Sequence, residues 1–161
     1  MQRNFLLEDN PSFHIALYQP QIPPNTGNIA RLCVATGSHL HIIRPTGFSL
    51  SDKRLKRAGL DYWKYLKLTV HDSLEDFLKF VNGRTMYLAS TKAHFTIFDK
   101  SYAKGDIFLF GSETEGLPEW LLLKYSQQCI NIPMKPQVRS LNLSDSVSIV
   151  VYEAIRQVVF G

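Results

Sequence analysis

The stretch "DIFLFGSETEGLP", Asp106 to Pro118, decides the fold class. It begins as an uninterrupted apolar run, which is typical of a strand covered on both faces in a parallel sheet. Two carboxylates, two glycines and a proline then follow within eight residues. The sequence therefore predicts an inner strand of a parallel sheet that opens into a polar loop at its carboxyl end.

Strand-like and helix-like segments alternate on both sides of this stretch. We expect strands at 13–19, 40–45, 66–71, 85–91, 106–110 and 129–133, and helices at 25–37, 51–59, 72–83, 118–124 and 144–160. Expected helix caps are Asn25 or Thr26, then Ser51 or Asp52, and Ser73, with Gly37 ending the first helix. This alternation predicts an α/β fold, a mostly parallel sheet with helices on both faces. We expect one domain over residues 1–161, with residues 1–12 as a leader.

Composition excludes several classes of protein. The chain has 161 residues and 45% apolar content, enough for one self-supporting core. It has no apolar run of about 18 residues and no export signal, so we expect a cytoplasmic protein without a membrane segment. Cys33 and Cys129 lie far apart, with no CxxC and no histidine at ligand spacing, which favours buried thiols and no metal site.

Positive charge is concentrated in one segment. Residues 44–67 hold seven Lys and Arg against two Asp, a net of +5, whereas the whole chain carries +4. Such a segment suits a polyanion, because each phosphate contact releases counterions. A solvated helix face is an equally weighted alternative.

Three polar loops follow predicted strands and should meet at one edge of the sheet. They are "PPNTGNIAR" (23–31), "GSETEGLP" (111–118) and "PMKPQVRSLNLS" (133–144). Each also has a purely structural interpretation: Asn25 could cap a helix, Gly116 could serve a turn, and Asn142 with Ser144 could cap the last helix. The chain lacks GxGxxG, GxxxxGK[ST] and GxSxG, which disfavours dinucleotide, nucleoside triphosphate and serine hydrolase chemistry.

These loops carry a family resemblance. "PPNTGNIAR", "FGSETEGLP" and "RSLNLSDSVSIVVYEA" resemble the three ordered motifs of the SpoU branch of the SPOUT RNA 2′-O-methyltransferases. The stretch "IIRPTGFSLSDKRLKRAGLDYW" narrows the resemblance to the minimal enzymes that methylate the wobble cytidine or uridine, position 34, of tRNA. It covers nearly the whole chain, from about Ile15 to Val158.

The resemblance implies a C-terminal trefoil knot whose loops hold S-adenosylmethionine, and a homodimer that binds the tRNA anticodon arm. By motif position it implies catalytic roles for Arg31, Glu113 and Asn142, cofactor contacts at Ala89, Gly111, Ile132, Ser140 and Leu141, and substrate contacts at Asn25, Arg31, Arg54, Arg57 and Ser144. Two alternatives stay open. One is a methyltransferase of the same branch that acts on rRNA or another tRNA position, and the other is a non-catalytic RNA-binding protein.

Overall fold

The computed structural model describes residues 12–59 and 61–161, so the predicted leader lies, apart from Ser12, outside the described residues. Seven strands form one sheet in the order β3-β2-β1-β6-β4-β7-β5, and every strand pair is parallel. Their bounds are β1 His14–Tyr18, β2 His39–Ile43, β3 Leu68–His71, β4 Met86–Ala89, β5 Phe95–Thr96, β6 Ile107–Phe110 and β7 Cys129–Asn131. The parallel sheet predicted from Asp106 to Pro118 is confirmed.

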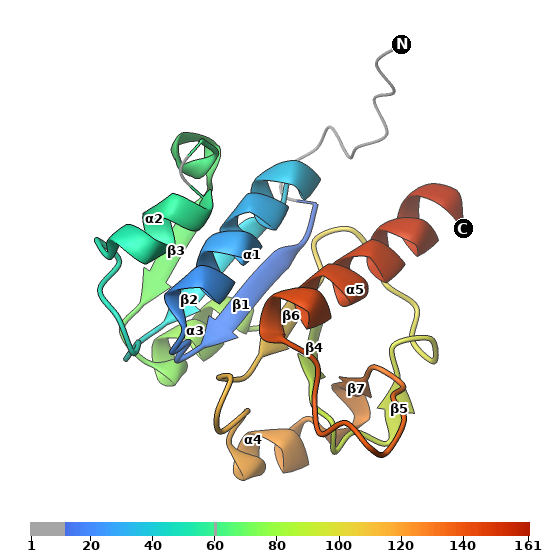
Figure 1. Ribbon diagram of the computed structural model, residues 1–161. Helices are drawn as coiled ribbons and strands as arrows, with labels where there is room; N and C mark the ends of the chain where they lie inside the picture. Colours follow the sequence, from blue (N-terminus) through green and yellow to red (C-terminus); the bar gives the residue numbers. More distant parts are fainter. Residues whose placement is uncertain (1–11, 60) are drawn as a thin grey trace.

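Helices cover both faces of this sheet, as predicted (Figure 1). One face packs against α1 and α5, and α2 lies on α1, while α3 and α4 cover the other face. The bounds are α1 Pro23–Thr36, α2 Lys53–Gly59, α3 Leu74–Val81, α4 Glu119–Lys124 and α5 Leu143–Ile155, with short turns at Trp63–Tyr65, Ser126–Gln128 and Arg156–Phe160. Among the described residues, no helix has both the length and the apolar character that crossing a membrane requires.

The apolar stripe of the last helix faces the sheet. Five apolar residues of this helix are fully or almost fully buried: Val147, Val150, Val151, Ala154 and Ile155. They pack with Phe108 and Phe110 of the central strand β6, whose four residues are all buried. Burial of both faces of β6 explains why its sequence shows no polar alternation.

Two of the three expected N-terminal caps are confirmed. The Ser73 hydroxyl accepts the backbone N–H of Asp76 at the start of α3, and the Asp52 carboxylate accepts that of Arg54 at the start of α2. The cap predicted for the first helix is wrong, because α1 begins two residues earlier, at Pro23, with Ile22 as its N-cap. Proline suits the first helical positions, where no intrahelical N–H bond is needed.

The C-terminal end of α1 follows its prediction. Gly37 takes the left-handed conformation, with φ of 67°, and its N–H bonds back to carbonyls in the last turn. A residue with a side chain is strained in that conformation, so glycine ends the helix where β2 must begin.

The strand order divides the sheet into two halves. In the first, β1, α1, β2, α2 and β3 follow one another along the chain and in space. In the second, β6, β4, β7 and β5 are neighbours out of chain order. The short β5, Phe95–Thr96, lies between the strands predicted at 85–91 and 106–110, where no strand was predicted, and it forms by pairing with β7. The trefoil knot stays a prediction.

Candidate active site

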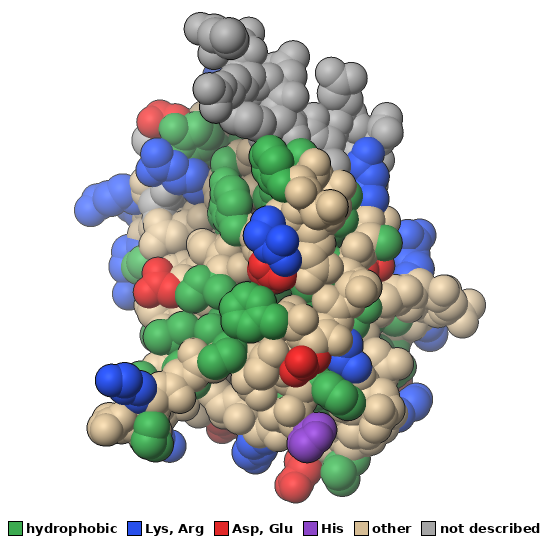
Figure 2. Space-filling view, turned by 90° about the vertical axis from the view of Figure 1, so that its right-hand side faces the viewer, with side chains coloured by type: hydrophobic (Ala, Val, Ile, Leu, Met, Phe, Trp, Pro, Cys, Tyr) green, Lys and Arg blue, Asp and Glu red, His purple; other side chains and the backbone are tan. Residues whose placement is uncertain are grey.

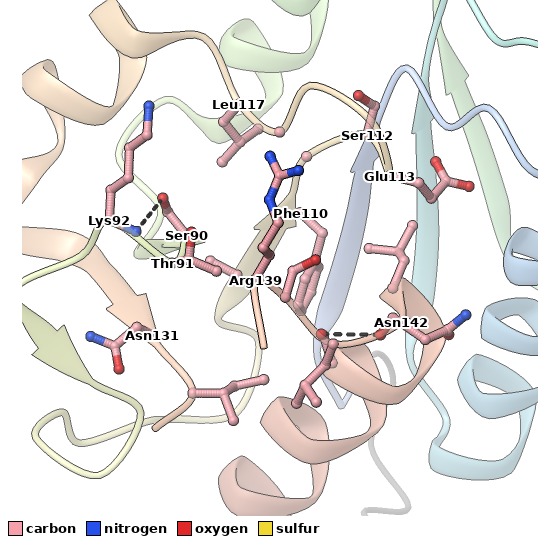
Figure 3. A pocket seen from close by; sticks show the side chains of 18 of the residues that line it. Ser90, Thr91, Lys92, Phe110, Ser112, Glu113, Leu117, Asn131, Arg139 and Asn142 are labelled. Carbon is pink, nitrogen blue, oxygen red and sulfur yellow. Dashed lines mark hydrogen bonds between the residues drawn. The ribbon is translucent and has the colours of Figure 1, made fainter. Parts of the chain in front are cut away.

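A cavity of about 620 Å³ lies at the carboxyl ends of β4, β6 and β7 (Figure 3). Five segments line it, together with Leu122 of α4: the start of α1, the loops after β4, β6 and β7, and the start of α5. The buried side chains of Phe110, Ile130 and Val150 form part of its apolar lining. The three polar loops that the sequence singled out thus all contribute to one cavity, with Asn25 representing the first of them and Ile22 lying just before it.

The loop from Gly111 to Pro118 folds back on itself. The Gly116 N–H donates to the Ser112 carbonyl at 3.0 Å, and the Ser112 hydroxyl accepts the Glu115 N–H at 3.1 Å. A Cβ on Gly111 would lie 2.3 Å from the carbonyl carbon of Gly116, and Gly116 itself has φ of 70°. Glycine is therefore required at both positions by the loop's own closure.

Glu113 ties this loop to the start of α1. Its two carboxylate oxygens accept the backbone N–H groups of Gln21 at 2.9 Å and Ile22 at 2.8 Å, and the Asn25 side-chain amide at 3.3 Å. A carboxylate at a helix N-terminus also faces the positive end of the helix dipole. One side chain thus joins the second predicted motif to the first.

Asn142 extends the same chain of contacts to the third motif. Its amide N–H donates to the Asn25 side-chain oxygen at 3.1 Å. Its own side-chain oxygen accepts the Ser144 N–H at 2.9 Å, the Ser144 hydroxyl at 2.7 Å and the Asp145 N–H at 3.3 Å, which caps α5. The structural interpretation of Asn142 as the cap of the last helix is thus confirmed, whereas Ser144 donates to Asn142 and is not itself the cap. Glu113, Asn25 and Asn142 form one continuous hydrogen-bonded connection between three segments distant in sequence.

Charged side chains also line the cavity, whose remaining lining is partly polar and partly apolar. Figure 3 shows Arg139 in the middle of the pocket, Lys92 on the side of the loop after β4, and Glu113 on the opposite side. Arg139, Lys92 and Glu115 are exposed, whereas Glu113 is half-buried. The cavity can therefore hold a ligand that has apolar surface as well as polar or charged ends.

Most of the predicted site residues lie together. Those that line the cavity are Ala89, Gly111, Ile132, Ser140, Leu141, Glu113, Asn142 and Asn25. Asn25 is 6% exposed, and both ends of its amide are used within the chain. Ser144 does not line the cavity but contacts it through Asn142.

The three predicted arginines lie outside the cavity. Arg31 is exposed on α1, with its guanidinium 4.9 Å from the centre of the Tyr62 ring and 3.5 Å from the Tyr62 hydroxyl. Arg54 and Arg57 are exposed on α2, and Arg54 pairs with Asp52 at 3.1 Å. These side chains belong to the surface formed by α1, α2 and the following turn.

The sequence interpretation missed one wall of the cavity. Ser90, Thr91 and Lys92 line it directly after β4, and so does Asn131 at the end of β7, whose amide donates to the Ala93 carbonyl at 2.7 Å. The signal was available, since "STK" is a polar run immediately after an apolar strand. No metal site was expected, but within the described ranges His14, His39 and His41 form one group able to hold an ion, away from this cavity.

Comparison with protein-family models gives an assignment that is consistent with this site. The model of the SpoU rRNA Methylase family matches residues 12–152, a span that includes all three loop segments. The chain therefore belongs to the SpoU methylase family, and the resemblance drawn from the motifs is confirmed.

Individual proteins also resemble this chain over most of its length. The tRNA (cytidine(34)-2′-O)-methyltransferase of Methylovorus glucosotrophus (strain SIP3-4) is 50% identical over 149 residues, covering 90% of this chain and 95% of the relative. The enzyme of the same name from Escherichia coli (strain K12) is 51% identical over 148 residues, covering 89% and 92%. A solved structure described as "Structural insights into the 2-OH methylation of C/U34 on tRNA" superposes with a TM-score of 0.87 at 45% identity, covering 90% of this chain and 95% of that one.

Proposed function

We propose that this protein transfers a methyl group from S-adenosylmethionine to the ribose 2′-hydroxyl of the wobble nucleotide, position 34, of tRNA. The observation that carries the proposal is the meeting of the three motif segments at one cavity of about 620 Å³, joined through Glu113, Asn25 and Asn142. The relatives at 50% and 51% identity bear the name of this activity. We place the reaction in the cytoplasm.

The residues of the cavity fit the cofactor. Its volume is within the range of about 300–1,000 Å³ that small-molecule sites occupy, and its apolar floor of Phe110, Ile130 and Val150 suits an adenine ring. The backbone around Gly111 and Leu141, together with Ala89, Ile132 and Ser140, would hold the ligand. Bound there, S-adenosylmethionine supplies a methyl group that its sulfonium has already activated.

The chain must mainly align the nucleotide and help a neutral hydroxyl to lose its proton. We assign this work to Arg31. An arginine side chain almost never gives up its proton in a protein, so it is a poor general base. Its guanidinium is better suited to grip the phosphate next to the ribose and to polarise the 2′-hydroxyl, while a phosphate oxygen or water accepts the proton.

Glu113 and Asn142 act in this proposal by holding the loops in place. Their side chains are occupied by backbone and amide donors, and Asn25 is buried between them. We therefore propose that Asn25 positions the pocket wall for the nucleotide without a direct grip on RNA. Ser144 supports the same wall through its two bonds to Asn142.

We also propose a homodimer formed through α1 and α5. These helices pack together on one face of the sheet, and apolar side chains are exposed at Ile149 and Tyr152 of α5 and at Ile22, the N-cap of α1. Figure 2 shows apolar side chains gathered in a patch on the side of the molecule where the chain ends. In such a dimer the partner subunit's Arg31 would reach a cavity to which Arg31 of the same chain does not contribute.

The cationic surface of α2 would bind the anticodon arm. Arg54 and Arg57 are exposed there, on the side of the sheet that also carries Arg31. Contacts from arginine to phosphate fix the position of an RNA without reading its sequence.

Calorimetry with S-adenosylmethionine, followed by transfer assays on tRNA and on rRNA, tests the proposed activity. We expect heat of binding and methylation of tRNA, with the product located at position 34 by nucleoside mapping. Transfer to rRNA alone would replace the substrate assignment, and the absence of both heat and transfer would favour a non-catalytic RNA-binding protein.

The role of Arg31 has its own test. Arg31→Lys should retain a small residual activity with an unchanged pH profile, because a lysine can still grip phosphate. A profile shifted to a lysine-like base would contradict the gripping role.

A heterodimer with Arg31→Ala in one subunit and Gly111→Ala in the other tests the shared site. If Arg31 acts across the interface, one of the two sites is intact and about half of the activity returns. A heterodimer no more active than the Gly111→Ala homodimer would place Arg31 at its own subunit's cavity.

A further inference from the structure

Four histidines lie together beneath α3, in the half of the sheet that does not hold the cavity. His14 begins β1, His39 and His41 belong to β2, and His71 ends β3. They share one face of the sheet because side chains alternate along each strand and the register places His14 beside His39. His14, His41 and His71 are buried, whereas His39 is half-buried. The proposed methyl transfer uses none of them.

Their ring nitrogens are already close to one another. His14 Nδ1 lies 2.9 Å from His41 Nε2, and His41 Nδ1 lies 2.9 Å from His71 Nε2. His39 Nε2 lies 2.8 Å from the Thr69 hydroxyl, and the His39 and His41 rings are stacked with centroids 4.4 Å apart. The apolar cover is Phe77 and Phe80 of α3, whose rings contact those of His41.

We propose that His14, His39 and His41 form a transition-metal site that can take Zn²⁺. One nitrogen from each ring lies within 4.8 Å of the other two. Imidazole is a preferred ligand of zinc, copper and nickel, and three histidines with an open fourth position are an established zinc coordination set.

The ligand geometry needs an adjustment of ring orientation as well as of distance, because the stacked His39 and His41 rings, 17° apart, must turn before their nitrogen lone pairs can converge on one ion. Zinc–nitrogen bonds of about 2.0–2.1 Å place two ligands of a tetrahedral ion about 3.3 Å apart. The His14–His41 pair, at 2.9 Å, must therefore open slightly, while the more distant nitrogens must close. The half-buried His39 marks the side from which an ion and its fourth ligand, water, would enter.

His71 has a separate place in the site. Metal-bound histidines usually donate their other ring N–H to an acceptor, which fixes the ring and its tautomer. With His41 Nε2 on the ion, His41 Nδ1–H would donate to His71 Nε2, a contact already present at 2.9 Å. His71 is thus a positioning residue, and Thr69 can serve His39 in the same way through its hydroxyl.

Neighbouring charges set the expected strength of binding. The Arg84 guanidinium lies 4.5 Å from the centre of the Phe80 ring and acts electrostatically on His14 and His41, and Lys67 acts on His39. Asp76 is the carboxylate that acts on His71. Because two cations oppose the ion and no carboxylate ligates it, Arg84→Gln should tighten binding.

Zinc titration of chelator-treated full-length protein tests the site, by calorimetry and by the visible absorption of Co²⁺ as a probe of tetrahedral geometry. We expect one ion per chain and a rise in Tm with Zn²⁺, because a ligand that binds only the folded state stabilises it. His39→Ala, at a half-buried position, should weaken binding by about tenfold or more. His94→Ala, which removes an exposed loop histidine outside the group, should leave binding unchanged.

The outcomes separate a metal site from a hydrogen-bonded histidine ladder. Binding lost in His39→Ala, kept in His94→Ala and tightened in Arg84→Gln supports the site. No bound ion, or an affinity equal in His39→Ala and the parent protein, overturns it. The Tm of each variant without metal shows whether the fold is retained, and His14→Ala repeats the test should His39→Ala unfold.

Discussion

The two halves of the sheet differ in whether strands that are neighbours in space are also neighbours in sequence. In the half containing β3, β2 and β1, each strand lies beside the next one in sequence, and helices α1 and α2 fill the connections. In the half containing β6, β4, β7 and β5, neighbours in space are not neighbours in sequence, and the cavity lies at the ends of three of these strands. Periodicity and helix caps therefore predict the local half, whereas the site depends on long-range strand pairing. Changes that affect one half and spare the other test this division.

The largest effect is expected for Gly111→Ala. A Cβ there would lie 2.3 Å from the backbone carbon of Gly116, so the loop that lines the cavity must move. Overpacking costs about 1–3 kcal/mol, and we expect the affinity for S-adenosylmethionine, measured by calorimetry, to fall by about tenfold to a hundredfold.

Gly83→Ala is the matched control for that change. Gly83 has a positive φ, 76°, and a Cβ there meets no atom within 4 Å, whereas Gly111 has the close contact without a positive φ. It should lose stability through backbone strain while cofactor affinity stays unchanged. An equal loss of affinity in the two variants would show that a general loss of stability, and not the clash with Gly116, is responsible.

The second largest effect is expected for Glu113→Gln, which should lower the free energy of unfolding. The carboxylate accepts two backbone N–H groups and the Asn25 amide, and a glutamine has one acceptor oxygen for these donors. Hydrogen bonds to charged groups contribute about 1.5–3 kcal/mol, and because Glu113 is half-buried we expect a loss of about 1.5 kcal/mol in urea unfolding. Glu115→Gln, an exposed carboxylate in the same loop, should stay within about 0.5 kcal/mol of the parent.

These two positions also show how far the sequence could predict the site. The motifs placed Gly111 and Glu113 in the pocket loop, and both line the cavity. The sequence could not reveal that Glu113 reaches Gln21 and Ile22, 92 and 91 residues away, because that contact follows from the pairing of β1 with β6. The same distance in sequence explains why Asn25 was expected to cap a helix or to contact the substrate, and not to join Glu113 to Asn142.

The fold shows the same limit. The third helix was predicted well, because Ser73 and the apolar spacing of the helix are local signals. The strand Phe95–Thr96 was missed, because two residues carry no periodicity and the strand exists only through its pairing with β7. The histidine group was missed for a related reason: His14 and His39 meet only when β1 and β2 pair.

A smaller effect is expected on the cationic surface of the first half. Arg54→Glu with Arg57→Glu should weaken tRNA binding by about fivefold near 0.1 M salt. The slope of log affinity against log salt should become shallower by about 1–2, because a phosphate that the protein no longer contacts keeps its counterion in the complex. Filter binding over a salt series measures both. Lys79→Glu on α3, on the opposite face of the sheet, is the control. An unchanged slope in the double variant would remove α2 from the RNA-binding surface.

The smallest effect is expected for the cap of α3, and it tests whether the two halves of the sheet are independent. Ser73→Ala removes the hydroxyl that accepts the Asp76 N–H at 3.1 Å, and the loss of such a cap costs about 1 kcal/mol or less at an exposed site. Urea unfolding should show this loss, and Ser73→Asp should recover it, since the carboxylate is also an acceptor. Affinity for S-adenosylmethionine should remain that of the parent, because α3 covers the histidines and contributes nothing to the cavity lining. If Ser73→Ala weakened cofactor binding as much as it weakened folding, the two halves would be coupled, and the pocket could not be treated as a product of the second half alone.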